Sequence, residues 1–285
     1  MGEVYLADHR FLRRACAVKL IKPEQAGNEE TLARFEREVR AAARLTHPNT
    51  VQIFDYGRAE DGTFYYAMEY LPGISLQELV DQHGPLPPSR AVYIMTQLCR
   101  ALREAHAVGL IHRDIKPANV IVGERGREYD VAKLLDFGLV ASTNVAEHDA
   151  ILTQAGMILG TPAYMSPEQC GGEANVTASS DIYSLGAVGY FLLTGLTPFS
   201  GRAPMQVIAA HLYETPAPIS ARRPDVPEAL SRAIARALEK TVVARYEDVE
   251  AFERELVASM NGGAWTSRDA REWWAHREKS SNALQ

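Results

Sequence analysis

The sequence has few cysteines, no long apolar run and no segment that looks like a secretion signal. Its three cysteines, Cys16, Cys99 and Cys170, are far apart and lack the CxxC spacing of metal sites. This pattern favours a reducing compartment and argues against a structural metal site. The longest strongly apolar run, 185–193, has nine residues and contains two glycines, whereas a membrane span needs about 20. We therefore expect no membrane span and a cytoplasmic location.

The sequence also lacks a block of basic residues. Lys and Arg total 30 against 36 Asp and Glu, which gives a formal net charge of −6. A mildly acidic chain of this kind is a poor nucleic-acid binder. Hydrophobic residues make up 46% and charged residues 23% of the 285 residues, as in ordinary globular proteins. At about 150 residues per domain, this length predicts about two domains.

The periodicity changes after the first 70 residues. Strand patterns at 4–7, 16–21, 51–56 and 64–71 surround one helical pattern at 29–45. After residue 76 helical patterns dominate. One helix is expected to begin at Ser89 as its N-cap and to end near Gly109. A small strand pair, at 120–122 and 132–135, follows this helix, and the segment 182–193, apolar on nearly all faces, predicts a buried central helix. We expect further helices near 205–213, 227–238 and 249–260.

The domain boundaries follow from this change. We predict a sheet-rich lobe at 1–71, a larger helical lobe at 72–261, and a linker with a tail helix at 262–285. Thr266 and Asp269 have the spacing of a capping box at the start of the tail helix. Because exposed tryptophan pairs are uncommon, we expect this helix to pack on its own chain.

Lys19 lies in an otherwise apolar strand and needs an anionic partner. Glu38 shares a helix stripe with Ala42 and Leu45, which should face inward. A Lys19–Glu38 pair would hold the ammonium group for the α- and β-phosphates of a nucleotide. Taken alone, an exposed lysine and a solvated glutamate fit these residues better.

The segment 112–119 reads His-Arg-Asp-Ile-Lys-Pro-Ala-Asn. It brings a carboxylate, a cation and an amide together on a loop that follows a capped helix. Phosphoryl transfer requires these groups to accept a hydroxyl proton, to stabilise γ-phosphoryl charge and to ligate Mg²⁺. The alternative is a solvated charged turn, and this full string argues against it.

Two further segments follow in the order that this chemistry needs. Asp136, in Leu-Leu-Asp-Phe-Gly, ends an apolar strand 22 residues after Asp114. A carboxylate there could bind the metal that bridges the phosphates. The segment 160–168, Gly-Thr-Pro-Ala-Tyr-Met-Ser-Pro-Glu, comes after 21 loop-like residues, and a loop of that length is usually functional.

Together these motifs resemble the eukaryotic-like Ser/Thr protein kinases of bacteria over about residues 2–260. The resemblance implies an α+β fold of two lobes: a small antiparallel sheet with one key helix, and a larger, mostly helical lobe. It also implies ATP and Mg²⁺ as cofactors, and proteins with Ser or Thr acceptors as substrates. Self-association for autophosphorylation is a further implication.

The resemblance assigns roles to residues at the matching positions. It makes Asp114 the catalytic base and Lys116 the γ-phosphate contact. The implied Mg²⁺ ligands are Asn119 and Asp136, and the implied activating ion pair is Lys19 with Glu38. The implied nucleotide contacts are Gly2 and Val4 of the glycine-rich loop, Ala17, the gatekeeper Met68, the hinge residues Glu69 to Leu71, and Ile121.

Structural and regulatory roles follow from the same resemblance. Glu168 would pair with Arg245, and Asp181 would hold the backbone of the catalytic loop. Arg113 would accept a phosphate on the loop, with Thr153 as the phosphorylated residue and Thr161 in the Gly-Thr-Pro segment; the alternative is an unmodified loop threonine.

The sequence departs from the family pattern at its start, because residue 1 falls inside the glycine-rich loop and the first two loop glycines are absent. One expectation is a start-site error or a truncated gene and a complete kinase. The other is a catalytically impaired pseudokinase or scaffold. A small-molecule phosphotransferase is a third alternative, which the segment 160–168 argues against.

Overall fold

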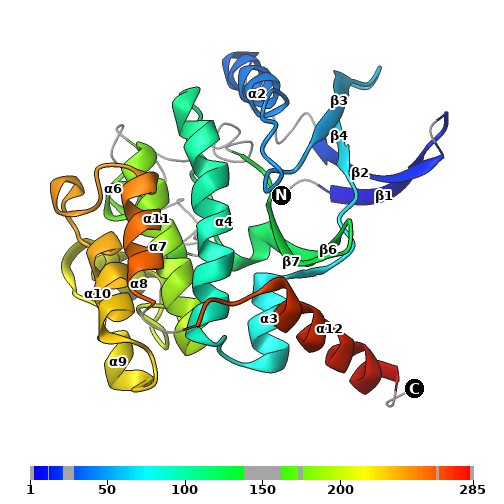
Figure 1. The fold of residues 1–285 in the computed structure, drawn as a ribbon. Helices are drawn as coiled ribbons and strands as arrows, with labels where there is room; N and C mark the ends of the chain where they lie inside the picture. Colours follow the sequence, from blue (N-terminus) through cyan, green and yellow to red (C-terminus); the bar gives the residue numbers. More distant parts are fainter. Residues whose placement is uncertain are drawn as a thin grey trace.

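The computed structural model describes residues 3–11, 13–21, 29–137, 162–172, 176–260 and 263–282. They form two lobes of the predicted α+β type, with the smaller lobe near the N-terminus (Figure 1). The small lobe is a four-stranded antiparallel sheet in the order β1-β2-β4-β3, with helix α2 packed against it. Its elements are β1 (Glu3–His9), β2 (Arg14–Ile21), α2 (Glu29–Ala42), β3 (Ile53–Arg58) and β4 (Phe64–Glu69).

The large lobe is mostly helical and carries a second, three-stranded sheet in the order β5-β6-β7. Its strands are β5 (Ile74–Ser75), β6 (Val120–Arg125) and β7 (Glu128–Leu134). Its α-helices are α3 (Leu76–His83), α4 (Pro88–Ala107), α6 (Pro167–Cys170), α7 (Ala178–Thr194), α8 (Pro204–Tyr213), α9 (Ile219–Arg222), α10 (Glu228–Ala237), α11 (Val249–Ala258) and α12 (Ser267–Asn282). Single 3-10 turns are η1 (Pro117–Asn119), η2 (Pro162–Tyr164) and η3 (Val242–Ala244).

Helix α7 is the predicted central helix, and it is buried from Ser179 to Leu193. Two glycines let its neighbours approach closely. A Cβ on Gly189 would lie 2.6 Å from Met95 Cε of α4, and one on Gly186 would lie 2.8 Å from Ala237 Cβ of α10. Side chains at these positions would therefore force the three helices apart.

The prediction that Ser89 caps a helix is wrong. Helix α4 begins at Pro88, and its N-cap position is held by Pro87, two residues before Ser89. Proline is favoured in the first turn of a helix, because its fixed φ suits the helix and it has no N–H to leave unpaired. A capping box does occur nearby, where Ser75 and Glu78 begin α3.

The tail helix α12 packs on the large lobe beside α3, as predicted (Figure 1). Its anchor is Asp130 of β7, which is fully buried and pairs with Arg90 of α4 through two hydrogen bonds of 2.7 and 2.8 Å. The indole N–H groups of Trp265 and Trp274 also donate to Asp130, at 2.8 and 2.7 Å. The Arg90 guanidinium lies 3.8 Å from the ring centroid of Trp273. One buried carboxylate therefore joins β7, α4 and the tail.

The capping box that the sequence predicts at the start of the tail helix is present. Thr266 N–H donates to Asp269 at 2.8 Å, and Asp269 N–H donates to the Thr266 hydroxyl at 3.3 Å. Within the described residues, no helix combines the length and the apolar character needed to cross a membrane.

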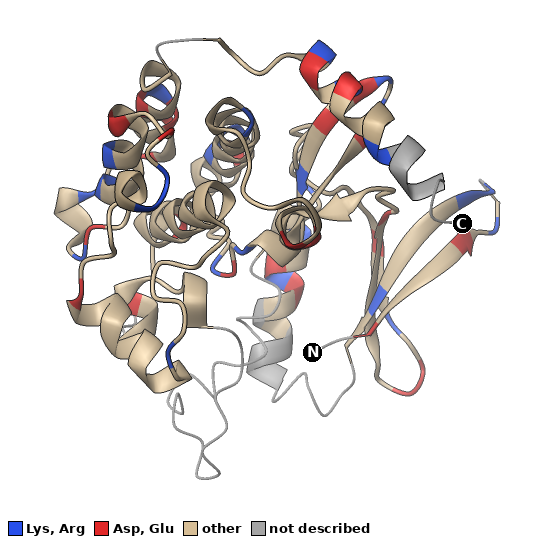
Figure 2. Ribbon diagram, turned by 90° about the horizontal axis from the view of Figure 1, so that it is seen from below, with Lys and Arg blue, Asp and Glu red and all other residues tan. Residues whose placement is uncertain are grey.

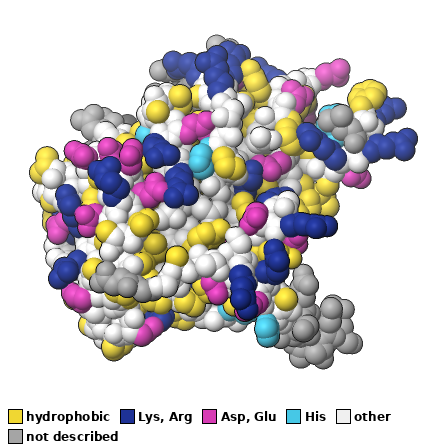
Figure 3. Space-filling view, in the orientation of Figure 1, with side chains coloured by type: hydrophobic (Ala, Val, Ile, Leu, Met, Phe, Trp, Pro, Cys, Tyr) yellow, Lys and Arg dark blue, Asp and Glu magenta, His cyan; other side chains and the backbone are white. Residues whose placement is uncertain are grey.

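The surface carries charges of both signs. Basic and acidic residues are interspersed along both lobes in Figure 2, and on the face in Figure 3 they lie among apolar side chains. This mixture fits the small net charge of −6.

We expect Asp130→Asn to lower the free energy of unfolding by about 3–5 kcal/mol, because it leaves the Arg90 guanidinium buried without its ionic partner. For a chain of this size the thermal midpoint should fall by roughly 10 °C. Asp225→Asn is the control, since its ion pair with Arg223 is exposed and should contribute little. Thermal melts followed by circular dichroism test this, and equal midpoints for the two variants would contradict it.

Candidate active site

Among the described residues, three ion pairs join the lobes: Lys19 with Asp136, Glu38 with Arg113, and Glu69 with Lys133. The Lys19 ammonium of β2, which is buried, contacts Asp136 Oδ2 at 2.6 Å, just beyond β7. The Tyr66 hydroxyl of β4 donates to Asp136 Oδ1, also at 2.6 Å. Burial alone would raise the pKa of Asp136, but Lys19 and the hydrogen bonds outweigh it, so the pKa is lowered. Burial, with the nearby Asp136 charge, raises the pKa of Tyr66 well above its ordinary value, so its hydroxyl stays protonated as a donor.

The second pair joins Glu38 of α2 to Arg113, with Arg113 Nη1 2.9 Å from Glu38 Oε1. The prediction that Lys19 pairs with Glu38 is therefore wrong for this structure. Glu38 does face inward, as its helix stripe predicts, but the spacing cannot tell which cation it meets. In the structure Lys19 pairs with Asp136 instead, and the long side chain of Arg113 reaches Glu38 on α2.

Three of the predicted site residues converge on the loop after α4. Lys116 Nζ lies 2.7 and 3.0 Å from the two carboxylate oxygens of Asp114. Asn119 Nδ2 donates to Asp114 Oδ2 at 2.9 Å and to its backbone oxygen at 2.8 Å. The side chain of Asp114 keeps 33% of its surface exposed. This carboxylate is therefore fixed by two neighbours and still accessible from solvent.

Asp181, at the start of α7, holds the backbone of this loop. It accepts hydrogen bonds from the N–H groups of His112 and Arg113, each at 2.9 Å, and lies 2.7 Å from His106 Nε2. Arg113 has a left-handed φ of 65°, a conformation that a non-glycine residue keeps only when its surroundings hold it. The loop geometry is therefore fixed from the buried core of the large lobe.

Three contacts at the loop were not predicted. His112 Nε2 lies 2.7 Å from the Leu135 carbonyl oxygen, which ties the loop to the segment that carries Asp136. Gln169 Nε2 donates to the Arg113 carbonyl at 2.7 Å. His106 contacts Asp181. The sequence offered two signals: His112 lies inside the segment 112–119, and Gln169 directly follows the segment 160–168. His106 had none.

Glu168 and Arg245 form the predicted pair. Their side chains are almost fully buried and make two hydrogen bonds of 2.8 and 2.9 Å. Ser180 also donates to Glu168, at 2.6 Å. Burial alone would raise the pKa of Glu168, but the hydrogen bonds from Arg245 and Ser180 outweigh it and the pKa is lowered. The pair fastens the segment after residue 162 to the helical core.

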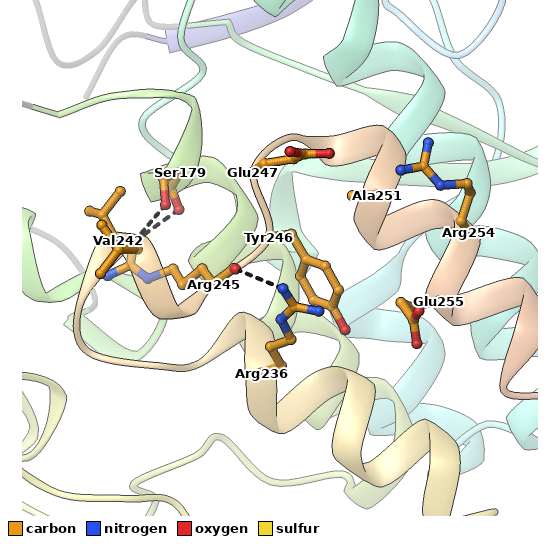
Figure 4. Close-up of a pocket in the computed structure, with 10 residues that line it drawn as sticks. Ser179, Arg236, Val242, Arg245, Tyr246, Glu247, Ala251, Arg254 and Glu255 are labelled. Carbon is orange, nitrogen blue, oxygen red and sulfur yellow. Dashed lines mark hydrogen bonds between the residues drawn. The ribbon is translucent and has the colours of Figure 1, made fainter.

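A hollow of about 590 Å³ lies beside this pair, between α10, η3 and α11 (Figure 4). Arg245 lines it, with Arg236 donating to the Arg245 carbonyl at 3.3 Å. Its lining includes none of the residues predicted to contact a nucleotide.

The predicted nucleotide contacts of the small lobe lie around Lys19. Val4 is opposite Lys19 in the β1–β2 ladder, and Ala17 is opposite Met68 in the β2–β4 ladder. Met68 is buried, whereas 56% of Val4 is exposed. These residues thus occupy three adjacent strands on the side of the sheet near Asp136.

The predicted hinge residues connect the two sheets. The Glu69 carboxylate pairs with Lys133 of β7, and Leu71 packs against the apolar core of the small lobe. Ile121 lies in β6 opposite Lys133. Gly2, Thr153 and Thr161 lie outside the described residues.

The donor set fits Mg²⁺. Asp136 supplies a carboxylate and Asn119 an amide oxygen, because Asn119 uses its nitrogen on Asp114. Hard oxygen donors of this kind suit Mg²⁺, which usually binds proteins through one or two such ligands together with phosphate oxygens. The described part of the chain holds no cluster of three or more His, Cys, Asp or Glu side chains that could hold a metal ion.

Comparison with known proteins agrees with the motifs. Residues 1–255 match the family described as "Protein kinase domain". The chain belongs to the protein kinase family. It is 42% identical over 260 residues to the serine/threonine-protein kinase pkn3 of Myxococcus xanthus, covering 90% of the chain and 47% of that protein. It is 39% identical to PknB of Mycolicibacterium smegmatis, covering 93% of the chain and 42% of that protein. It is also 38% identical to PrkC of Bacillus subtilis, covering 90% of the chain and 38% of that protein.

Solved structures confirm the predicted fold. The PknI kinase domain of Mycobacterium tuberculosis superposes with a TM-score of 0.70 at 30% identity, covering 91% of this chain and 90% of that one. Rad53 in complex with AMP-PNP has a TM-score of 0.71 at 23% identity, over 89% and 61% of the two chains, which supports the fold alone. The chain is thus a homologue of Ser/Thr protein kinases, a family that uses ATP. It spans about half the length of the curated relatives it matches.

We expect Glu168→Gln to lower the free energy of unfolding at pH 7 by about 3 kcal/mol, because Arg245 stays buried without a carboxylate. The folded state lowers the pKa of Glu168 from its ordinary 4.5, so its stabilising effect is complete above pH 4.5 and is lost as the pH falls through the lower folded value.

The difference between the wild type and Glu168→Gln should therefore shrink below about pH 4.5, as urea unfolding at several pH values would measure. The matched control is Glu214→Gln, whose pair with Arg202 is exposed. A difference that stays constant or grows on acidification would contradict this explanation.

Proposed function

We propose that the chain is an active, ATP-dependent protein serine/threonine kinase that transfers the γ-phosphoryl group to Ser and Thr hydroxyls of proteins. The observation that carries this proposal is the convergence of Lys116 and Asn119 on the accessible carboxylate of Asp114. It is supported by homology to serine/threonine kinases over 90% of the chain.

Asp114 would accept the proton of the substrate hydroxyl as its oxygen bonds to the γ-phosphorus, while the bond from that phosphorus to the β–γ bridging oxygen breaks and ADP leaves. Lys116, which now neutralises Asp114 at 2.7 Å, would move to the γ-phosphoryl oxygens when substrate and nucleotide are bound. Asn119 would keep Asp114 oriented through the hydrogen bond to its backbone oxygen. Catalysis would thus depend on positioning and on charge placed before the reaction begins.

Asp136 and Asn119 would hold Mg²⁺, which neutralises phosphate charge when it is bound. For that, the Lys19 ammonium must leave Asp136 and turn to the phosphates, with Glu38 as its new partner. Arg113 would then lose Glu38 and be free to bind a phosphate on Thr153. The described arrangement, with Lys19 on Asp136 and Glu38 on Arg113, would be the resting state of this exchange.

The substrates of the whole protein, its self-association and its cytoplasmic location stay predictions. The last is supported by three cysteines that are all unpaired and buried.

Asp114→Asn should lower the rate of phosphate transfer from labelled ATP to a generic protein substrate by roughly 10²–10⁴-fold, because an amide cannot accept the hydroxyl proton. Nucleotide binding should be unchanged. The exposed residue Asp55 provides the control, since Asp55→Asn should keep the wild-type rate. Wild-type protein that binds ATP but transfers no phosphate would favour a pseudokinase instead, and transfer to small alcohols in place of protein would favour a small-molecule phosphotransferase.

Thr153 should become phosphorylated when the wild-type protein is incubated with ATP and Mg²⁺, as mass spectrometry of the 139–159 peptides would measure. The Asp114→Asn variant should show no phosphate there, because the modification depends on the chain's own activity. Thr153→Ala should lower transfer to other substrates by removing the anion that engages Arg113. Phosphate exclusively at other residues, or full activity of Thr153→Ala, would exclude this site.

A further inference from the structure

Tyr66 places a hydroxyl group inside an otherwise apolar cluster. The side chain belongs to the core of the small lobe and is 1% exposed. Its ring contacts Phe35 of α2, with the centroids 6.5 Å apart. Neither the sequence motifs nor the proposed transfer mechanism assigns a role to this hydroxyl. Phenylalanine would fill the same apolar space, so the hydroxyl calls for an explanation of its own.

Strand register explains why the hydroxyl reaches Asp136. Tyr66 is directly opposite Lys19 in the antiparallel β2–β4 ladder, and opposite residues point to the same face of a sheet. The two side chains therefore approach Asp136 together, with Lys19 Nζ 5.9 Å from the Tyr66 ring centroid.

The carboxylate of Asp136 divides its two oxygens between these donors. Oδ2 takes the Lys19 ammonium and Oδ1 takes the Tyr66 hydroxyl, each at 2.6 Å. A buried carboxylate with a missing partner is strongly disfavoured. Here each oxygen has a strong donor from the protein itself, so Asp136 is satisfied without a metal ion. Asp136 is also held at a left-handed φ of 55°, which shows how tightly its surroundings constrain it.

We propose that Tyr66 is a positioning residue that stabilises the Lys19–Asp136 pair and thereby raises the Mg²⁺ concentration needed for nucleotide binding. This inference rests on the proposed function, in which Asp136 turns to Mg²⁺ and Lys19 to the phosphates. The hydrogen bond from Tyr66 favours the paired state because it satisfies the oxygen that Lys19 does not reach. Without this hydrogen bond, Asp136 Oδ1 has no donor in the paired state. The state in which Asp136 binds a cation then becomes more favourable relative to the paired state.

The test is Tyr66→Phe, which keeps the ring packing against Phe35 and removes the hydroxyl alone. Tyr65→Phe is the matched control, because Tyr65 is the adjacent residue on the opposite, half-exposed side of β4. Binding of a fluorescent ATP analogue is measured by titration with Mg²⁺. We expect the Mg²⁺ midpoint to fall roughly tenfold in Tyr66→Phe, as for the loss of one hydrogen bond to a charged group, and to stay at the wild-type value in Tyr65→Phe.

The outcomes separate the role of Tyr66 from the proposed function. An unchanged or higher midpoint in Tyr66→Phe overturns the inference, even if the nucleotide-free variant melts at a lower temperature, since a packing role alone would produce that. Wild-type protein that binds no nucleotide at any Mg²⁺ concentration overturns the proposed function itself. If Tyr66→Phe does not fold, Tyr66→Leu, which also lacks the hydroxyl, must give the same fall in the Mg²⁺ midpoint.

Discussion

The buried carboxylate of Asp181 fixes the position of the loop on which the proposed chemistry depends. It lies at the start of α7, the helix around which the large lobe packs, and two backbone N–H groups of the loop donate to it. Two glycines of α7 let α4 and α10 approach closely and keep that helix in place. Asp114, Lys116 and Asn119 can therefore converge at hydrogen-bonding distance although they lie on an irregular segment. The accuracy of the site comes from the rigid core beneath it.

Two of the ion pairs that connect the lobes, Lys19 with Asp136 and Glu38 with Arg113, consist of four charged side chains at the proposed site. All four are residues that the family resemblance assigns to catalysis or regulation, yet here they satisfy one another. Each pair joins one group from the small lobe to one from the large lobe, so exchanging partners requires the lobes or α2 to shift. Within the proposed function, the same charges thus stabilise the resting state and serve the active one, with the nucleotide, the metal and a loop phosphate as competing partners.

Much of this architecture could be predicted from the sequence because the signals were local. Helix α7 was predicted from its apolar residues on all faces, the strands other than the two-residue β5 from their patterns, and the tail helix from its capping box. Glu168 with Arg245 and Asp181 with the loop backbone came from family motifs. The partner of Lys19 could not be predicted in this way. Helix periodicity shows that Glu38 faces inward, but it does not give the distance between Glu38 and a cation on the other lobe. Tyr66 was missed because one hydroxyl among apolar side chains leaves no pattern. The prediction of Ser89 as an N-cap was wrong because the fixed φ of Pro88 suits the first position of helix α4 and set its start there instead.

The anchoring of the tail has a practical consequence. The family match ends at residue 255, but Trp265 and Trp274 complete the hydrogen bonding of Asp130, a residue of the kinase core itself. A catalytic fragment cut where the family profile stops would expose the Arg90–Asp130 pair to water and remove the ring that covers its guanidinium. The family match therefore ends before the residues that complete this buried hydrogen-bond network, which reaches Trp274 of α12.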